Sequence, residues 1–260
     1  MAEARDRHGQ PAGAPSAPSA QAPAWYAPSG GRWRDWITVL HPPYTAWHLS
    51  YVLIGAAMAP RFHLDRLLAT LIAFGLAVGV GAHGLDELRG RPLRTRISSP
   101  VLATVSVVAI CGAVTLGALG IAQVGWGLSI FILVGVFLVI AYNLELWHGR
   151  FHNDTTFALA WGSFPVLTAY YAQAGTVRPA VIAGAAFAYG LSRAQRVLSA
   201  EARDLRRRVT SVEGERIYAD GSRRAISLGS VLAPLERGLI ALSWSTCALG
   251  VGLVVARTGH

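Results

Sequence analysis

The chain has 260 residues, of which 53% are hydrophobic and only 14% are charged, and its mean hydropathy is +0.40. This balance is typical of an integral membrane protein and excludes a water-soluble domain built around one buried core. The net charge of +9 comes from arginine alone, and the arginines flank apolar stretches instead of forming one basic domain, so nucleic-acid binding is not expected.

The first 36 residues are rich in Ala, Pro, Ser and Gly and have no apolar periodicity. This composition predicts a disordered segment over 1–36. No apolar stretch within it is followed by a small-residue cleavage site, so it is not expected to be a signal peptide. A single transmembrane domain is predicted over 37–260.

Seven apolar stretches follow, and each has about the 20 residues that an α-helix needs to cross the hydrocarbon core. They cover 37–59, 65–83, 99–120, 124–144, 155–174, 178–198 and 235–257. The sequence therefore predicts an all-α membrane bundle of about seven transmembrane helices. The charged segment 199–209 is expected to continue the sixth helix, and Gly214, Asp220 and Gly221 are expected to end it in a loop.

Most of the 23 arginines lie on one side of these predicted helices, before the first stretch or within 84–98, 143–154 and 193–230. Short loops with excess positive charge stay in the cytoplasm. We therefore expect a multi-pass protein of the inner (plasma) membrane, with a cytoplasmic amino terminus and an extracytoplasmic carboxyl terminus. The same segments hold most of the polar residues that could perform chemistry.

The first such group stands at the end of the second stretch, where His83, Asp86 and Glu87 are three and four residues apart and share one helical face. Acids at the membrane edge are costly unless they bind a cation or a partner, so these three are candidate catalytic residues, with Asp86 and Glu87 as candidate metal ligands. The arginines that follow could hold phosphate oxygens: Arg89, Arg91, Arg94 and Arg96. Alternatively, this is a solvated loop in which acids and arginines pair.

A second group follows the fourth stretch, over 142–154. Glu145 and His148 have the E-x-x-H spacing of di-iron bundles, and His152 follows one turn later. Together with His83 and Glu87 they could bind Fe, Mn or Zn, which makes a His/carboxylate metal enzyme one alternative. Aromatic side chains of the fifth stretch could wall a cavity for an isoprenoid cation: Trp161, Phe164, Tyr170 and Tyr171.

The runs 41–48 (HPPYTAWH) and 55–59 (GAAMA), with the polar motif that ends the second stretch, resemble the UbiA superfamily of intramembrane prenyltransferases over roughly 38–200. Where that family has N-D-x-x-D-x-x-x-D, this chain has His83 for Asn, Glu87 for the second Asp and Arg91 for the last. Gly84 replaces the first Asp, and the Arg-Pro-Leu run over 91–93 continues the likeness. Where the family has its second acid-rich motif, 192–208 is rich in arginine.

The resemblance implies a prenyl transfer from an isoprenoid diphosphate, with Mg²⁺ as a possible cofactor, in a cavity that opens to the cytoplasm. Because the family's acids are partly replaced here, Arg193, Arg196 and Arg203 could join Arg89, Arg91 and Arg94 as diphosphate ligands without a metal. The residues implied for the cavity wall are Tyr142, Asn143, Glu145, His152 and Gln195. The alternative to an enzyme of this kind is a non-catalytic membrane protein that binds an isoprenoid or another lipid.

Overall fold

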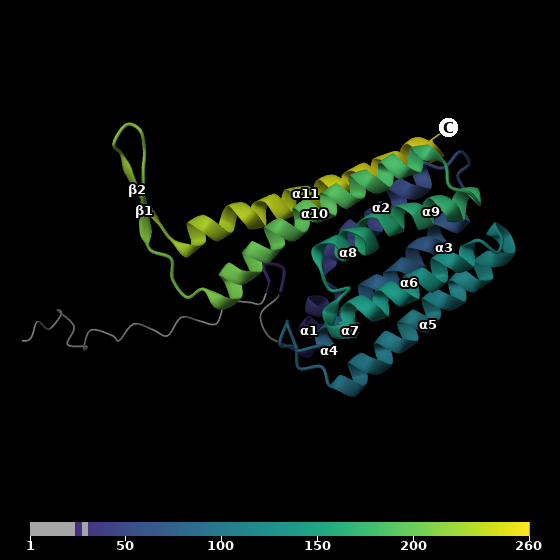
Figure 1. Cartoon of the computed structure of the whole chain (residues 1–260), viewed down its shortest axis with the longest axis horizontal. Helices are drawn as coiled ribbons and strands as arrows, with labels where there is room; N and C mark the ends of the chain where they lie inside the picture. Colours follow the sequence, from purple (N-terminus) through teal and green to yellow (C-terminus); the bar gives the residue numbers. More distant parts are fainter. Residues whose placement is uncertain (1–23, 28–30, 260) are drawn as a thin grey trace, which may run out of the picture.

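The computed structural model describes residues 24–27 and 31–259 (Figure 1). The disorder predicted over 1–36 falls largely outside the described residues, except that a helix already begins at Arg32. The helical elements are α1 (Arg32–Leu40), α2 (Pro42–Ala57), α3 (Leu64–Phe74), η1 (Gly75–Ala82), α4 (His83–Leu88), α5 (Ser99–Val124), α6 (Leu128–Asn143), α7 (Leu146–Gly149), α8 (Asp154–Ala158), η2 (Leu159–Ser163), α9 (Phe164–Ala174), α10 (Pro179–Arg208) and α11 (Leu228–Thr258). Two strands, β1 (Gly214–Ile217) and β2 (Arg223–Ile226), lie between α10 and α11.

The protein is mainly helical, and each of the seven predicted apolar stretches falls on helix. Among the described residues, three helical segments are long and apolar enough to cross a membrane: Leu64–Leu88, Ser99–Val124 and Leu228–Thr258. Leu128–Asn143 is apolar but shorter. Helix length and composition thus support three membrane-spanning helices among the described residues, fewer than the seven predicted. One reason is that the first stretch is divided at His41, which adopts a left-handed conformation (φ 46°, ψ 55°) before two prolines.

Helices α2 and α9 lie at the centre of the bundle and pack against each other. The long antiparallel pair α10 and α11 covers one side, with α11 against α2, while α5 and α6 form the opposite side (Figure 1). Glycine permits close approach between the layers. A Cβ added at Gly162 of η2 would lie 2.7 Å from the Ala188 carbonyl oxygen of α10, so a larger residue does not fit there. Small residues at helix contacts are typical of membrane bundles.

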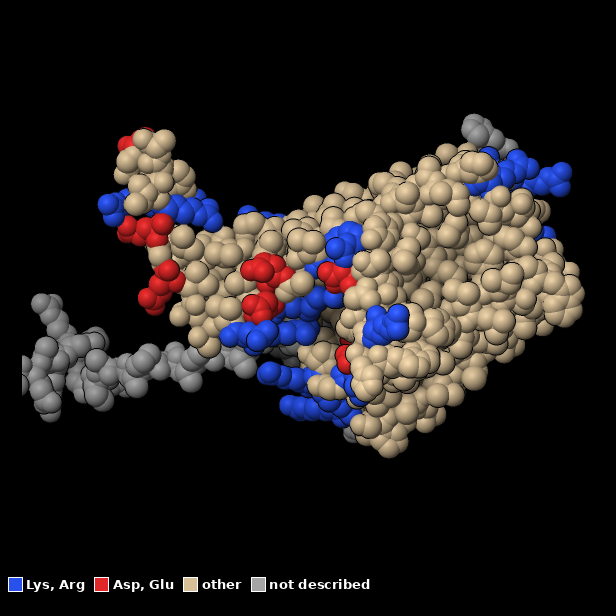
Figure 2. All heavy atoms as spheres, viewed as in Figure 1, with Lys and Arg blue, Asp and Glu red and all other residues tan. Residues whose placement is uncertain are grey.

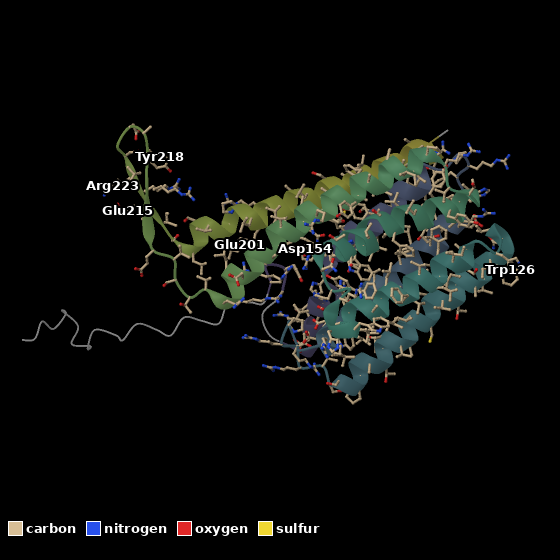
Figure 3. The ribbon with its side chains drawn as sticks, in the orientation of Figure 1. Trp126, Asp154, Glu201, Glu215, Tyr218 and Arg223 are labelled. Atoms are coloured by element: carbon tan, nitrogen blue, oxygen red, sulfur yellow. The ribbon has the colours of Figure 1, made fainter. Side chains whose placement is uncertain are left out.

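The outward faces of the bundle are apolar. Val108 on α5 and Trp244 on α11 are 65% and 73% exposed. Trp126, which follows α5 at the end of the bundle away from the hairpin, is 81% exposed (Figure 3). Such a surface is unfavourable in water but suits a lipid environment. Most charged side chains gather instead at the end that carries the strands (Figure 2).

Two features of the fold were not predicted from the sequence. Helix α10 continues to Arg208, as expected, but the predicted loop contains an antiparallel β-hairpin in which Arg216 is paired with Arg224. In addition, η1 and η2 are π-helical turns within otherwise α-helical segments. Such turns widen a helix locally and are frequent at functional sites.

Candidate functional site

A cavity of about 360 Å³ lies at the charged end of the bundle, among α2, α4, α10 and the segment after α6. Charged side chains surround a hollow at this end (Figure 2). Many of the predicted site residues line the cavity: His83, Asp86, Arg89, Tyr142, Asn143, Glu145, His152, Gln195 and Arg196. Four others do not line it: Glu87, Arg91, Arg94 and Arg193. The fold therefore brings together residues that are more than 100 positions apart in the chain.

His83 and Asp86 stand on α4, which continues directly from the π-helical turn η1. The Nδ1 atom of His83 lies 3.3 Å from the Gly79 carbonyl oxygen, and its ring centroid lies 4.5 Å from that of His41. Asp86 follows one turn later and faces the same cavity. No arginine in the described ranges lies within ion-pair distance of the Asp86 carboxylate, which leaves it as the cavity's best candidate base.

Glu87 does not lie in the cavity, where a catalytic residue was predicted. Its side chain is fully buried, and its carboxylate accepts hydrogen bonds from the backbone N–H groups of Leu93 and Thr95, each at 2.9 Å, and from the Thr95 hydroxyl at 2.8 Å. These bonds hold the loop after α4 against the bundle. The catalytic and metal-binding role predicted for Glu87 is therefore corrected to a loop-stabilising one, because the buried carboxylate binds the loop and does not line the cavity.

Three of the predicted diphosphate ligands are also corrected. The Arg91 guanidinium donates to the Ile97 carbonyl oxygen at 2.5 Å and to the Ser99 hydroxyl at 2.7 Å, so it ties together the same loop as Glu87. Arg94 is exposed at the loop surface, and Arg193 lies 3.6 Å from the Asp154 carboxylate outside the cavity. Spacing alone did not distinguish these arginines from the ones that face inward.

One face of α10 supplies the cavity's positive charge. Arg196, Arg203 and Arg206 line the cavity, and their spacing of seven and three residues places them on one face of the helix. Arg196 donates to the Asp154 carboxylate at 2.8 Å, and Arg206 donates to the Glu236 carboxylate at 2.7 Å through Nε. Figure 3 shows Asp154 beside α10. Arg89, the residue that follows α4, also lines the cavity and lies 3.5 Å from Glu145.

Arg203 differs from these neighbours because it has no acidic partner in the part of the chain that the structure describes. It is half-buried, and burial, together with the nearby Arg196 and Arg207 charges, lowers the pKa of its guanidinium. A partly buried cation without a counter-ion is unfavourable unless an anion is supplied from outside. The electrostatics of this face therefore favour an anionic ligand.

The segment after α6 adds an aromatic and imidazole wall. The Tyr142 and His152 rings are stacked with centroids 4.5 Å apart, and His152 Nδ1 lies 3.1 Å from the Tyr142 carbonyl oxygen. The predicted helical E-x-x-H pair is wrong. Glu145 and His148 adopt left-handed conformations (φ 50° and 59°), and His148 is exposed, so the two do not share a helical face directed at the cavity.

Three buried polar atoms in the cavity wall have no hydrogen-bond partner among the described residues. They are Gln195 Oε1 on α10, a residue that is 3% exposed, His41 Nε2 between α1 and α2, and Trp25 Nε1. The other ring nitrogen of His41 is hydrogen-bonded to the Tyr26 hydroxyl. Buried polar atoms are normally satisfied, so these three are suited to a polar ligand group or an ordered water.

A second cavity, of about 260 Å³, continues into the bundle between η1, α5, α6 and α9. Its wall is mainly apolar, with Asp65, Arg66 and Gln123 among the exceptions, and it includes Trp161 and Phe164. Tyr170 and Tyr171 do not line it, contrary to prediction. Val78 and Trp161 line both cavities. Because Val78 lies in η1 and Trp161 in η2, the two π-helical turns form the boundary between the polar cavity and the apolar one.

The residues present do not form the acid-rich Mg²⁺ site that the resemblance implies. Mg²⁺ at a phosphate site is usually held by one or two protein carboxylates together with phosphate oxygens. Glu87 binds the loop backbone, Glu145 pairs with Arg89, and no cluster of three metal-ligating side chains occurs among the described residues. Asp86 alone of the predicted acids keeps its carboxylate available to the cavity.

Sequence reasoning missed several cavity residues. Arg206 and Arg207 were seen only as part of the charged segment 199–209, and Tyr26, Tyr44 and Glu236 were not predicted to lie at the site. The available signal was the spacing of arginines along 196–207, which repeats on one helical face. Tyr26 and Glu236 carry no comparable signal because only tertiary packing brings them to the cavity.

No protein-family model matches this chain, and comparisons with curated proteins and with solved structures give no match either. The resemblance to the UbiA superfamily therefore stays a prediction that rests on the sequence runs described above.

Proposed function

We propose that the protein binds an isoprenoid diphosphate in the polar cavity and acts on it as a UbiA-like intramembrane enzyme. The observation that carries this proposal is Arg203, a half-buried guanidinium that lines the cavity without an acidic partner among the described residues. Arg196, Arg206 and Arg89 line the same cavity. Guanidinium groups bind phosphate oxygens through forked, charge-assisted hydrogen bonds, so this set is suited to a diphosphate.

The apolar cavity supports an isoprenoid over a soluble diphosphate. It adjoins the polar cavity at Val78 and Trp161, so a ligand whose charged head lies among the arginines has an apolar space for its hydrocarbon chain. In this proposal the protein is inserted in the inner membrane, with the arginine-rich end in the cytoplasm and the carboxyl terminus outside. Diphosphate made in the cytoplasm would then reach the cavity directly.

In the proposed reaction the C1–O bond of the isoprenoid diphosphate breaks, and both electrons leave with the diphosphate. The arginines would stabilise the charge that develops on the departing oxygen. The Trp161 ring, at the boundary of the two cavities, would stabilise the allylic cation. An acceptor nucleophile, or a double bond of the same chain in a cyclisation, then forms the new carbon bond and gives up a proton to the Asp86 carboxylate.

A binding titration tests the proposal. Farnesyl diphosphate is added to the purified protein with and without EDTA, using Arg203→Gln and, as the control, Arg208→Gln. Arg208 stands on the same helix but is exposed and pairs with Asp204 at 3.2 Å. We expect binding that survives EDTA, weakens with salt and depends on Arg203. Absence of binding in both conditions would refute the diphosphate ligand, and its complete loss on chelation would show that a metal ion holds the substrate.

A non-catalytic lipid binder is the second candidate. The use of Glu87 by the loop favours it, because the cavity then keeps fewer acids for chemistry. Release of inorganic diphosphate from labelled farnesyl diphosphate, in the presence of a membrane lipid extract, separates the two candidates. An enzyme should release diphosphate, and Asp86→Asn should bind the ligand but release little. A binder should release none in either form.

A further inference from the structure

A third hollow, of about 370 Å³, lies between the β-hairpin and the first turns of α11, apart from the two cavities described above. Three arginines line it: Arg216, Arg224 and Arg237. The remaining lining side chains are small or apolar, and none of the described residues that line it is acidic. We propose that this hollow is a second anion site, which holds the phosphate of an anionic phospholipid from the leaflet on the arginine-rich side.

The two faces of the hairpin differ in their charge balance. Glu215 and Arg223 lie on one face, where the Arg223 guanidinium binds the Glu215 carboxylate at 3.0 Å (Figure 3). Arg216 and Arg224 are direct cross-strand partners, so their side chains share the opposite face, the one that lines the hollow. Like charges in directly opposed positions destabilise a strand pair. An anion between the two guanidinium groups removes that repulsion.

The position of Arg237, the third arginine, indicates where the hollow lies relative to a membrane. Arg237 and Arg257 stand on the continuous helix α11, and their separation of 20 positions corresponds to about 30 Å of helix, the thickness of the hydrocarbon core. Arg257 donates to the Ala59 and Pro60 carbonyl oxygens at the other end of the bundle, at 2.8 and 3.1 Å. Arg237 therefore lies at the level of the lipid head groups.

This depth favours a lipid phosphate over a soluble one. The hollow lies between Arg237 and the hairpin, which projects from the same end of the bundle (Figure 1). A phospholipid beside α11 presents its phosphate at this level at the high local concentration of a membrane surface. Anionic lipids are attracted to basic residues near the surface, and the described residues that line the hollow include three arginines and no acid.

The test compares two double variants from which equal charge has been removed. Arg216→Gln with Arg224→Gln empties the hollow of two cations, whereas Arg208→Gln with Arg223→Gln removes two exposed arginines of the same end that do not line it. Native mass spectrometry of the full chain measures bound phosphatidylglycerol against phosphatidylcholine. We expect the affinity for the most tightly bound phosphatidylglycerol molecule to fall roughly fivefold for each arginine removed from the hollow. The first double variant should therefore bind this lipid about 25-fold more weakly, and the control should bind it about as well as the unmodified protein.

Three results would overturn the proposal. One is equal phosphatidylglycerol retention in the two double variants. Another is equal retention of phosphatidylcholine by the unmodified protein. The third is displacement of the lipid by inorganic phosphate at matched concentration, which would assign the site to a soluble anion. Arg203→Gln should leave this lipid bound, so the outcome is independent of whether the polar cavity binds a diphosphate.

Discussion

Replacement of Arg203 by glutamine should weaken ligand binding and stabilise the ligand-free protein. Arg203 is half-buried among other cavity arginines, has no acidic partner in the described part of the chain, and has a pKa that burial and the Arg196 charge lower. A charge-assisted hydrogen bond contributes roughly 1.5–3 kcal/mol, so its loss should raise the Kd for farnesyl diphosphate roughly tenfold to a hundredfold. The same change removes an uncompensated cation from the empty cavity.

Two measurements on one sample check this prediction. Calorimetric titration in detergent gives the Kd, and a thermal melt without ligand gives the Tm. A gain of about 1 kcal/mol corresponds to a Tm rise of about 2–4 °C in a domain of this size. Arg208→Gln should change neither quantity appreciably, since Arg208 is exposed. An unchanged Kd, or a Tm that falls in Arg203→Gln, would refute the argument that this guanidinium is kept unpaired for a ligand.

Further predictions concern the loop, the cavity boundary, helix packing and topology. Glu87→Gln should lower stability by roughly 1–3 kcal/mol in a denaturation experiment while the Kd for farnesyl diphosphate stays the same, because buried N–H groups lose a charged acceptor. A stable variant that binds normally but has slowed turnover would restore the catalytic role. Val78→Trp should weaken binding of geranylgeranyl diphosphate more than binding of dimethylallyl diphosphate. The larger side chain narrows the passage between the polar and the apolar cavity, so only the longer hydrocarbon chain is excluded from the apolar cavity. Equal effects on the two ligands would contradict this prediction. Gly162→Leu should lower the Tm, since its side chain would overlap the α10 backbone. A reporter fused after His260 should be extracytoplasmic and one inserted within 212–222 should be cytoplasmic. Reporters on the same side would show that the helix count is wrong.

The length and position of the apolar stretches determined much of the helical fold from the sequence alone. Each predicted stretch falls on helix because an apolar run of about 20 residues has few other ways to satisfy its backbone in a membrane. The continuation of α10 to Arg208 was also predicted, since no helix-breaking residue interrupts that segment. The local details were not predictable in the same way. The break at His41, the π-helical turns and the β-hairpin depend on packing and on turn conformations that hydropathy does not encode.

The sequence determined which chemical groups gather at one end of the molecule, and only the tertiary structure decided what each of them does. Glu87 and Asp86 are adjacent in the chain, yet one is buried under the loop and the other faces the cavity, because neighbouring helical residues point in different directions. Likewise Arg193 and Arg203 stand on the same helix, but only Arg203 lines the cavity without an acidic partner among the described residues. Whether a charged group is paired depends on which acids other helices bring within about 4 Å, and that distance is set by packing between segments far apart in the chain.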